Sequence, residues 1–424
     1  MKLNQLNLSI IGLGYVGLPL AVAFSRKFSV ICYDNNSNRI NQLKEGIDET
    51  LEVKKKDLKN NENLIFTDNV NDLKKSNCYI ITVPTLVKKN KTPDLKPLMK
   101  ATNLVGKFLS KKSLVIFEST VFPGCTEEVC VPLLEKKSGL KYNQDFFCGY
   151  SPERINPGDK KHNILNTIKI TSGSNKKISN LVNKLYNQIV LVGTYKAESI
   201  KIAESAKIIE NIQRDVNIAL INEFSILFNK LNIDTLQVLK AAETKWNFLP
   251  FKPGLVGGHC IAVNPYYFTY RARKVKYFPK VILSARKVNN GMANYVVMQL
   301  IQKMKEKKIN INNSKILIMG ITFKENFADM RNSEVFNIIK KLKKYSCKIN
   351  VYDPFINSNE AKKFIKDIYI EKLKYNTYDG IIIAVAHNQF KRFGLNLIAK
   401  LGKKKKVIYD LKSIFRKNNI VTRL

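Results

Sequence analysis

A cysteine in a glycine-rich loop is the first residue of this sequence whose chemistry needs an explanation. The segment GLVGGHCIAVNPYY places Cys260 after two glycines and a histidine, and Asn264 stands four residues further on. Glycines offer little side chain to bury a thiol, and a thiolate is a strong nucleophile. The spacing alone leaves two hypotheses open, a nucleophilic cysteine and an ordinary loop residue.

A second pattern lies near the N-terminus, where an apolar run is followed by Gly12-x-Gly14-x-x-Gly17. The sequence then predicts a helix over 18–24 and a second strand that ends at Asp34. In such a unit the glycines let a pyrophosphate approach the helix N-terminus, and the acid accepts a hydrogen bond from a ribose hydroxyl. We therefore expect a dinucleotide site, and the acid favours NAD over NADP.

Two further predicted strands end in polar loops. They read CYIITV and LVIF, and the loops that follow contain Pro84-Thr85 and Ser119-Thr120. Loops at the carboxyl ends of strands in a doubly wound sheet face the ligand crevice. We therefore expect both loops to lie at the dinucleotide site.

One long helix is predicted over 197–231, with apolar side chains almost all round it, which indicates burial between other elements. A narrow polar stripe nevertheless runs along one side at helical spacing. Burying a lysine or an asparagine without partners is costly, so the stripe is either a satisfied structural network or the lining of a wet site. Its members are Glu204, Lys207, Asn211, Asp215 and Asn222.

The C-terminal part repeats the series of strand, loop, helix and strand, without a convincing direct repeat of the first. The predicted fold is α/β, with two Rossmann-like doubly wound domains joined by a central helical domain that contains one long helix. We expect a dinucleotide-binding domain over 1–195, a helical domain with the cysteine loop over 196–308, and a second Rossmann-like domain over 309–424. Lys324 and Arg331 flank the first loop of the last domain, where a second phosphate-bearing ligand would bind.

The composition is strongly basic, with 72 Lys and Arg against 34 Asp and Glu and a formal net charge of +38. This charge raises the hypothesis of a nucleic-acid or anionic membrane partner. The lysines, however, form short clusters along the whole chain, without the aromatic or amphipathic arrangement that would contact bases or lipid. We interpret them as a solvated surface that favours a polyanionic small substrate, and we expect no nucleic-acid partner and no membrane insertion.

The seven cysteines are scattered, odd in number and without metal-ligand spacing. They predict reduced thiols in a cytoplasmic protein, without a disulfide framework or a structural metal site. The run LSIIGLGYVGLPLAVAF has the length of a signal peptide, but its cleavage would destroy the phosphate-binding pattern, so we do not interpret it as one. No other stretch approaches the about 20 apolar residues that span a bilayer.

Long strings of the sequence also carry a resemblance to a known family. They are ESTVFPGCTEEVC, GYSPERINPGDKKH, AESAKIIENIQRDVNIALINE, KWNFLPFKPGLVGGHCIAVNPYYFTY and FKENFADMRNSEV. Over nearly the full chain the sequence resembles the UDP-glucose/GDP-mannose dehydrogenase family, whose members oxidise the 6-hydroxymethyl group of a nucleotide sugar to a carboxylate. Within it the strings are most similar to the UDP-N-acetylhexosamine branch, and the UDP-N-acetyl-D-glucosamine 6-dehydrogenases of Vi-polysaccharide type are nearest.

The resemblance implies that Cys260 is the catalytic nucleophile. Removal of one hydride from a primary alcohol gives an aldehyde, and a second hydride can leave only from a tetrahedral carbon. A thiolate that adds to the aldehyde supplies that carbon as a thiohemiacetal, whose oxidation gives a thioester that water hydrolyses.

Four other residues match the family's catalytic positions. Lys207 and Asn211, one helical turn apart on the stripe, are implied to hold a water, assist deprotonation of the alcohol and stabilise the oxyanion. Thr120 and Glu153 match a threonine and a glutamate that position water, and Glu153 is the candidate base for thioester hydrolysis.

The resemblance further implies contacts with NAD and with the UDP-N-acetylhexosamine. Lys324 resembles the family's nucleotide-sugar-binding lysine, Arg331 its arginine that reaches the dinucleotide, and His259 a structural or substrate-contacting residue. The expected cofactor contacts are Gly12, Gly14, Tyr15, Val16, Gly17, Asp34, Arg39, Pro84, Thr85, Ser119, Thr120 and Arg331. The expected substrate contacts are Glu153, Arg154, Lys207, Asn211, Gly257, His259 and Lys324.

The chain departs from the family at Asn264, where the family has an aspartate. Asparagine keeps the size and one acceptor, but it cannot take a proton or hold Lys207 cationic. We favour a four-electron, NAD-dependent UDP-N-acetylglucosamine 6-dehydrogenase that serves surface polysaccharide biosynthesis and forms a homodimer through the long helix. UDP-N-acetylgalactosamine and UDP-glucose remain open as substrates. The competing hypotheses are a nucleotide-sugar-binding protein that has lost catalysis and a two-electron hydroxyacid dehydrogenase, which needs no Cys260.

Overall fold

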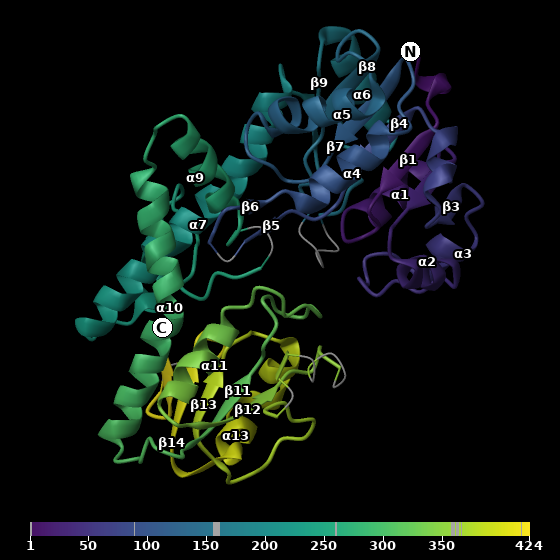
Figure 1. Ribbon diagram of the computed structural model, residues 1–424. Coiled ribbons are helices and arrows are strands. Elements are labelled where there is room, and N and C mark those ends of the chain that lie inside the picture. The colour runs from purple at the N-terminus through teal and green to yellow at the C-terminus, as the bar shows by residue number, and fades with distance from the viewer. Residues whose placement is uncertain are drawn as a thin grey trace. The chain divides into compact units, whose positions relative to one another are not determined.

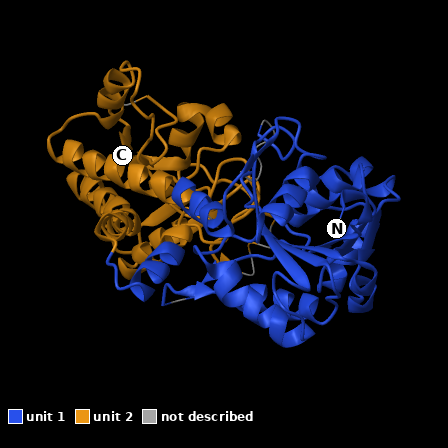
Figure 2. Cartoon of the chain, turned by 90° about the horizontal axis from the view of Figure 1, so that it is seen from above, with its two compact units in different colours: residues 1–210, 266–278 blue, residues 211–265, 279–424 orange. Residues whose placement is uncertain are grey.

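The computed structural model describes residues 2–88, 90–155, 162–258, 261–357, 361, 364–365, 367–416 and 418–424. The chain forms two compact units, shown in separate colours in Figure 2. The first unit contains residues 1–210 and 266–278, and the second contains residues 211–265 and 279–424. Each unit is built on a parallel or mostly parallel sheet with helices packed on it (Figure 1), which confirms the predicted fold class. The expected domain boundaries stay a prediction.

The sheet of the first unit has eight strands in the order β10-β9-β8-β7-β4-β1-β2-β3. All neighbours pair in parallel except β8 and β9. The central strands are apolar along nearly their whole length because both faces of a parallel sheet are covered. The strands are β1 Leu8–Ile11, β2 Val30–Tyr33, β3 Leu64–Thr67, β4 Cys78–Ile81, β7 Ser113–Phe117, β8 Phe146–Tyr150, β9 Lys169–Gly173 and β10 Thr194–Lys196, with a separate hairpin of β5 Leu86–Val87 and β6 Pro93–Asp94.

Two helices of the first unit begin at an asparagine that caps them. Asn36 accepts the backbone N–H groups of Asn38 and Arg39 at the start of α2, and Asn175 accepts that of Ile178 at the start of α6. The helices of the first unit are α1 Gly17–Ser25, α2 Ser37–Lys44, α3 Lys55–Lys59, α4 Lys96–Gly106, α5 Val131–Ser138 and α6 Lys176–Tyr186, with the short turns η1 Leu3–Gln5, η2 Val70–Lys75 and the π-helical η3 Thr126–Cys130.

The sheet of the second unit has five parallel strands in the order β12-β11-β13-β14-β15. Its core is formed by the apolar face of α10, between Met292 and Met304, packed with β11, β13 and α11. The elements are α8 Thr235–Ala242, α10 Lys280–Glu306, β11 Lys315–Met319, α11 Val335–Lys344, β12 Lys348–Tyr352, β13 Tyr378–Ile383, α13 Asn388–Leu401, β14 Gly402–Asp410 and β15 Val421–Arg423.

Two helices contribute residues to both units, α7 Ile200–Lys230 and α9 Asn264–Lys274. The predicted long helix is therefore confirmed, and it contains 31 residues. None of the helices in the described ranges combines the length and the apolarity that crossing a bilayer requires.

The polar stripe of α7 is buried, and within each unit its structural members have partners. Glu204 accepts the backbone N–H of Gly124 at 2.5 Å and both the N–H and the hydroxyl of Thr126 at 2.9 and 2.7 Å. Burial raises the pKa of Glu204 to about 7, although these three hydrogen bonds lower it. In the second unit, Asp215 pairs with Arg286 at 2.7 Å. Glu204 and Asp215 therefore belong to a structural network, and this part of the stripe does not line a wet site.

Candidate active site

The polar loops of the first unit meet at one edge of its sheet. Strands β1, β2, β4, β7 and β8 run in the same direction, so their carboxyl ends share that edge. The hydroxyl of Ser119 donates to the carbonyl of Val83 at 2.6 Å and so links the loops after β4 and β7. The predicted residues at this edge are the glycine pattern after β1, Asp34 after β2, Pro84 and Thr85 after β4, Ser119 and Thr120 after β7, and Glu153 after β8.

The three glycines of the turn after β1 are needed for three different reasons. Gly12 has φ +96°, which favours glycine, and its N–H donates to the carbonyl of Tyr33 at 2.9 Å. A Cβ on Gly17 would lie 1.9 Å from the carbonyl oxygen of Gly12, so only glycine allows helix α1 to pack there. A Cβ on Gly14 would meet no protein atom within 4 Å. Space is therefore left beside Gly14, at the N-terminus of α1, where a phosphate group binds in this kind of turn.

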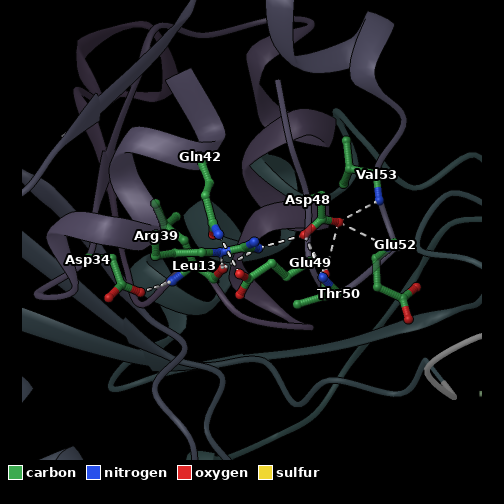
Figure 3. A network of polar contacts seen from close by, with 9 residues as sticks. All are labelled: Leu13, Asp34, Arg39, Gln42, Asp48, Glu49, Thr50, Glu52 and Val53. Carbon is green, nitrogen blue, oxygen red and sulfur yellow. Dashed lines mark hydrogen bonds and ion pairs between the residues drawn. The ribbon is translucent and has the colours of Figure 1, made fainter. Parts of the chain in front are cut away.

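The peptide groups on both sides of Leu13 are fixed by charged side chains (Figure 3). A carboxylate oxygen of Asp34 accepts the N–H of Leu13 at 2.8 Å, and the guanidinium of Arg39 donates to its carbonyl at 3.0 and 3.1 Å. Arg39 is 8 % exposed, and its Nη1 has no hydrogen-bond partner among the described residues. Asp34 and Arg39 therefore shape the glycine turn itself.

Asp48 completes this network, and sequence reasoning missed it. One of its oxygens accepts from Arg39 at 2.7 Å, and its carboxylate also accepts the backbone N–H groups of Thr50, Glu52 and Val53 at 3.0 Å (Figure 3). Burial raises the pKa of Asp48, but the hydrogen bonds from Arg39 and from the backbone hold it below its ordinary value. No sequence motif marks this residue, because the contact depends on the fold of the loop after α2.

Lys207 and Asn211 lie one turn apart on α7, each in its own unit. Lys207 is 6 % exposed, and within the described part of the chain no hydrogen bond or ion pair engages its ammonium group. In the second unit, the amide of Asn211 donates to the side-chain oxygen of Asn264 and accepts from Arg214. An ammonium on a mostly buried side chain with no partner in the protein has its hydrogen-bonding capacity left over, so Lys207 is suited to contact a ligand.

The start of the cysteine loop is held at fixed points in the second unit. The side-chain amide of Asn222 accepts the N–H of Gly254 at 2.7 Å and donates to its carbonyl at 3.0 Å. Gly258 has φ +86°, and a Cβ there would lie 2.7 Å from the ring of Phe323. A Cβ on the predicted substrate contact Gly257 would likewise lie 2.6 Å from a backbone carbonyl oxygen. The glycines before the cysteine are thus required by close packing. His259 and Cys260 lie outside the described residues.

Glu153 is oriented by the backbone of the two residues that follow it. One oxygen of its carboxylate accepts the N–H groups of Arg154 and Ile155, both at 2.6 Å, and the other accepts from Lys169 at 3.4 Å. The Arg154 guanidinium forms an ion pair with Glu210 at 2.8 Å. Sequence reasoning missed Lys169, which stands at the first position of β9.

The loop after β11 in the second unit carries the remaining predicted residues. Lys324 is half-buried, and Arg331 is mostly exposed and forms an ion pair with Asp329 at 2.6 Å. Sequence reasoning missed His387, which is fully buried. Its Nδ1 accepts a backbone N–H at 2.9 Å, so the proton of the neutral ring lies on Nε2, which is 3.2 Å from a carboxylate oxygen of Asp353.

Family models match this chain along most of its length. The NAD binding domain of the UDP-glucose/GDP-mannose dehydrogenase family matches residues 6–190, the central domain residues 201–291, and the UDP binding domain residues 317–417. The chain belongs to the UDP-glucose/GDP-mannose dehydrogenase family. The resemblance read from the sequence strings is therefore confirmed.

Similar proteins extend over the full length. The chain is 52 % identical over 412 residues to a UDP-N-acetyl-D-glucosamine 6-dehydrogenase of Salmonella typhi, covering 97 % of each chain. It is 51 % identical over 422 residues to a protein of the same name from Pseudomonas aeruginosa, covering 100 % of each. Among solved structures, the UDP-D-ManNAc dehydrogenase of Pyrococcus horikoshii superposes with a TM-score of 0.89 at 30 % identity, covering 98 % of each chain.

Membership of this family makes the chain an NAD-dependent nucleotide-sugar dehydrogenase, and its first unit fits the cofactor. The open space beside Gly14 admits a pyrophosphate, and the carboxylate of Asp34 lies at the end of β2, where a ribose is bound in Rossmann domains. When bound, NAD supplies the acceptor for the hydride. The chain's own contribution is the shape of the turn, which Arg39 and Asp34 fix.

Replacing Asp48 tests whether its ion pair with Arg39 holds the glycine turn in shape. Asp48→Ala leaves the Arg39 guanidinium buried without its anion, which should lower the free energy of unfolding by about 3–5 kcal/mol. The carbonyl of Leu13 should then be held less firmly, so KM for NAD should rise more than kcat falls. Thermal unfolding and initial rates against NAD concentration measure both effects. Glu49→Ala, at an exposed neighbour, is the matched control, and equal behaviour of the two variants would contradict the assignment.

Proposed function

We propose that this chain oxidises the C6 hydroxymethyl group of UDP-N-acetyl-D-glucosamine to the carboxylate, with reduction of two NAD per sugar. The observation that carries the proposal is Lys207, a residue only 6 % exposed whose ammonium forms no hydrogen bond or ion pair with the described residues, one helical turn from Asn211 on α7. The Salmonella typhi and Pseudomonas aeruginosa relatives, whose names give this substrate, support the choice of sugar. UDP-N-acetylgalactosamine and UDP-glucose are the alternatives that the same assay compares.

The proposed reaction has two oxidations and one hydrolysis. In the first, Lys207 and a water held with Asn211 take the proton of the C6 hydroxyl as the hydride leaves C6. The thiolate of Cys260 then adds to the aldehyde, and loss of a second hydride converts the thiohemiacetal into a thioester. Water oriented by Thr120 and Glu153 attacks the thioester carbon, the C–S bond breaks, and the uronate and the free thiol result.

The remaining expected contacts follow from the two nucleotide-binding domains. For NAD we propose the residues at the sheet edge of the first unit, with Tyr15 and Val16 at the start of α1, and Arg331. For the UDP-sugar we propose Arg154, Gly257, His259 and Lys324. The six described cysteines are free thiols, which supports work in the cytoplasm, and a hexosaminuronic acid is a building block suited to surface polysaccharides.

We also propose a homodimer that forms through α7. Exposed apolar side chains recur along the part of α7 that belongs to the second unit and at the residue directly after it, at intervals of four, three and four residues. Such spacing makes one continuous stripe, and a stripe of this kind can pair with itself across a two-fold axis. The members are Leu220, Phe224, Leu227 and Leu231, exposed by 51, 41, 48 and 56 %.

The stoichiometry of NADH tests the proposed reaction. The protein should form two NADH per sugar consumed, measured by absorbance with each UDP-sugar in turn, and no free aldehyde should accumulate. Cys260→Ser should reduce turnover severely and leave UDP-sugar binding nearly unchanged, because the thiol supplies nucleophilicity rather than affinity. One NADH per sugar with release of aldehyde would favour the two-electron dehydrogenase instead.

Asn264→Asp separates a slow enzyme from a binding protein. The side-chain oxygen that accepts from Asn211 is retained in this variant, and the carboxylate restores the negative charge. Turnover should rise about ten- to a hundredfold if a charge-assisted hydrogen bond of roughly 1.5–3 kcal/mol is regained in the transition state. The pH profile of kcat should shift as well, while the KM for UDP-sugar changes less. Equal rates and equal profiles would mean that another group serves in place of the aspartate, and two inactive proteins would favour the binding protein.

Charge on the stripe tests the dimer. Leu227→Glu should convert a dimer into a monomer in sedimentation equilibrium, because burying the carboxylate at an apolar interface is unfavourable. Lys230→Glu changes an exposed charge on the same helix and should leave the dimer intact. A Leu227→Glu protein that sediments like the wild type would exclude α7 as the interface.

A further inference from the structure

Glu153 belongs to a cluster of three buried charged side chains, and the reaction proposed above uses only Glu153. Glu118, Lys169 and Glu153 are 1, 2 and 8 % exposed, respectively. Tyr186 of α6, also buried, donates its hydroxyl to Glu118. All four belong to the first unit.

The register of the sheet explains how these residues meet. Glu118 directly follows β7, and Glu153 comes three residues after the end of β8, so both leave the sheet at its carboxyl edge. Strand β9 runs antiparallel to β8, with Tyr150 paired to Ser172. Continuing that register by three residues places Glu153 opposite Lys169, the first residue of β9. The one antiparallel pairing of this sheet therefore brings a lysine to the edge where the other strands end.

The contacts leave Lys169 shared between the two carboxylates. Its ammonium donates to Glu118 at 2.6 Å and to Glu153 at 3.4 Å. The second oxygen of Glu118 accepts from Tyr186, and the second oxygen of Glu153 accepts the backbone N–H groups of Arg154 and Ile155. Each carboxylate oxygen in this cluster thus has a donor, and the rotation of the Glu153 carboxylate is fixed from both ends.

Stability alone explains this arrangement poorly. Removing three charges from water is costly, and apolar side chains of similar volume often pack as stably as a buried ion pair. Burial raises the pKa of Glu118, while the two carboxylates raise the pKa of Lys169 against the effect of burial. Lys169 therefore stays a cation between the carboxylate of Glu118, which is held in the core, and that of Glu153, at the carboxyl edge of the sheet.

We propose that Lys169, anchored by Glu118, is a positioning residue for Glu153 in the hydrolysis of the thioester. The inference rests on the proposed function, because it concerns the step in which water attacks that carbon. Lys169 fixes one oxygen of Glu153 so that its remaining lone pair meets the water. During attack the proton of the water passes to Glu153, the C–S bond breaks, and the sulfur leaves as the thiolate of Cys260. Lys169 touches neither the sugar nor the cofactor in this account.

Charge removal at Lys169 should slow hydrolysis and spare both oxidations. In rapid-mixing experiments with the holoenzyme, Lys169→Met should form about two NADH per active site at the wild-type rate and then turn over about 100-fold more slowly. Mass spectrometry of the acid-quenched protein should show a uronyl adduct on Cys260. KM for UDP-sugar should change little, and Lys169→Arg, which keeps the cation, should restore most of kcat. Lys169→Gln also lacks the charge but keeps a donor for Glu118, so it should show the same burst followed by slow turnover. This variant tests the inference if Lys169→Met does not fold.

The pH profile adds a readout that a purely structural role would not change. A carboxylate that loses its neighbouring cation is protonated more readily, so the acid limb of kcat should move to higher pH in Lys169→Met. The titratable groups around Lys169 are Glu118 after β7, Glu153 after β8 and Tyr186 on α6. Arg154 beside Glu153 is paired with Glu210 of α7.

Three outcomes would overturn the inference. They are a burst that slows in proportion to kcat, absence of the adduct, and an Arg variant as slow as the Met variant. Arg271→Met breaks the ion pair with Glu128 in the same unit and should match the wild type in every readout. A wild-type protein that gives one NADH per sugar overturns the proposed function and this inference together, whereas two NADH without an adduct in Lys169→Met overturns the inference alone.

Discussion

Parallel pairing fixes the direction in which the chain leaves each strand, and the chemistry of the first unit depends on that constraint. Strands β1, β2, β4, β7 and β8 all end at one edge of the sheet, so loops from five distant parts of the sequence must meet there. Within the sheet, the backbone N–H and C=O groups of neighbouring strands pair with each other. The loops at the edge have no such pairing, so their backbone N–H groups and short polar side chains are left to bind other groups. The reversal at β9 adds a cation that a uniformly parallel sheet would not supply at this position.

The two Rossmann-like domains use the same turn and give it different surroundings. Gly12 and Gly320 have φ values of +96° and +92°, and each donates its N–H to the last residue of the neighbouring strand, at 2.9 and 2.8 Å. The acid after that strand, Asp34 or Asp353, accepts the N–H that follows the glycine. Asp34 is partly exposed and able to accept from a ribose, whereas Asp353 is buried under His387. The same glycine turn therefore leaves room for a dinucleotide in the first domain, and in the second it is closed by a buried histidine.

Much of this architecture could be predicted from the sequence, because strongly apolar strands and a glycine turn have local signatures. The apolar run before Gly12 is strand β1, the predicted second strand is β2, which ends one residue before Asp34, and the predicted long helix is α7. The polar stripe showed from spacing alone that α7 carries buried polar groups. Which of them are structural could not be predicted, since the partners of Glu204 and Asn222 lie far away in the sequence.

The residues that sequence reasoning missed share a physical character. Asp48, Lys169 and His387 act through pairs whose members are separated by 9 to 51 residues and meet only after the sheets form. No spacing rule links them, because sheet register and loop conformation determine the contacts. The roles of the predicted catalytic residues stay predictions, and Cys260 and His259 lie outside the part of the chain that the structure describes.

The contrast between Gly14 and Gly17 separates what the fold needs from what the ligand needs. A side chain at Gly17 would collide with the backbone of the turn, so a change there is felt by the protein whether or not a dinucleotide is present. A methyl group at Gly14 would enter open space, so a chain could accept it, fold normally and lose only the room for the pyrophosphate. Among proteins with this architecture, the residue at the second glycine position is therefore the better marker of whether a nucleotide cofactor is still in use, and the third marks only that the fold has been kept.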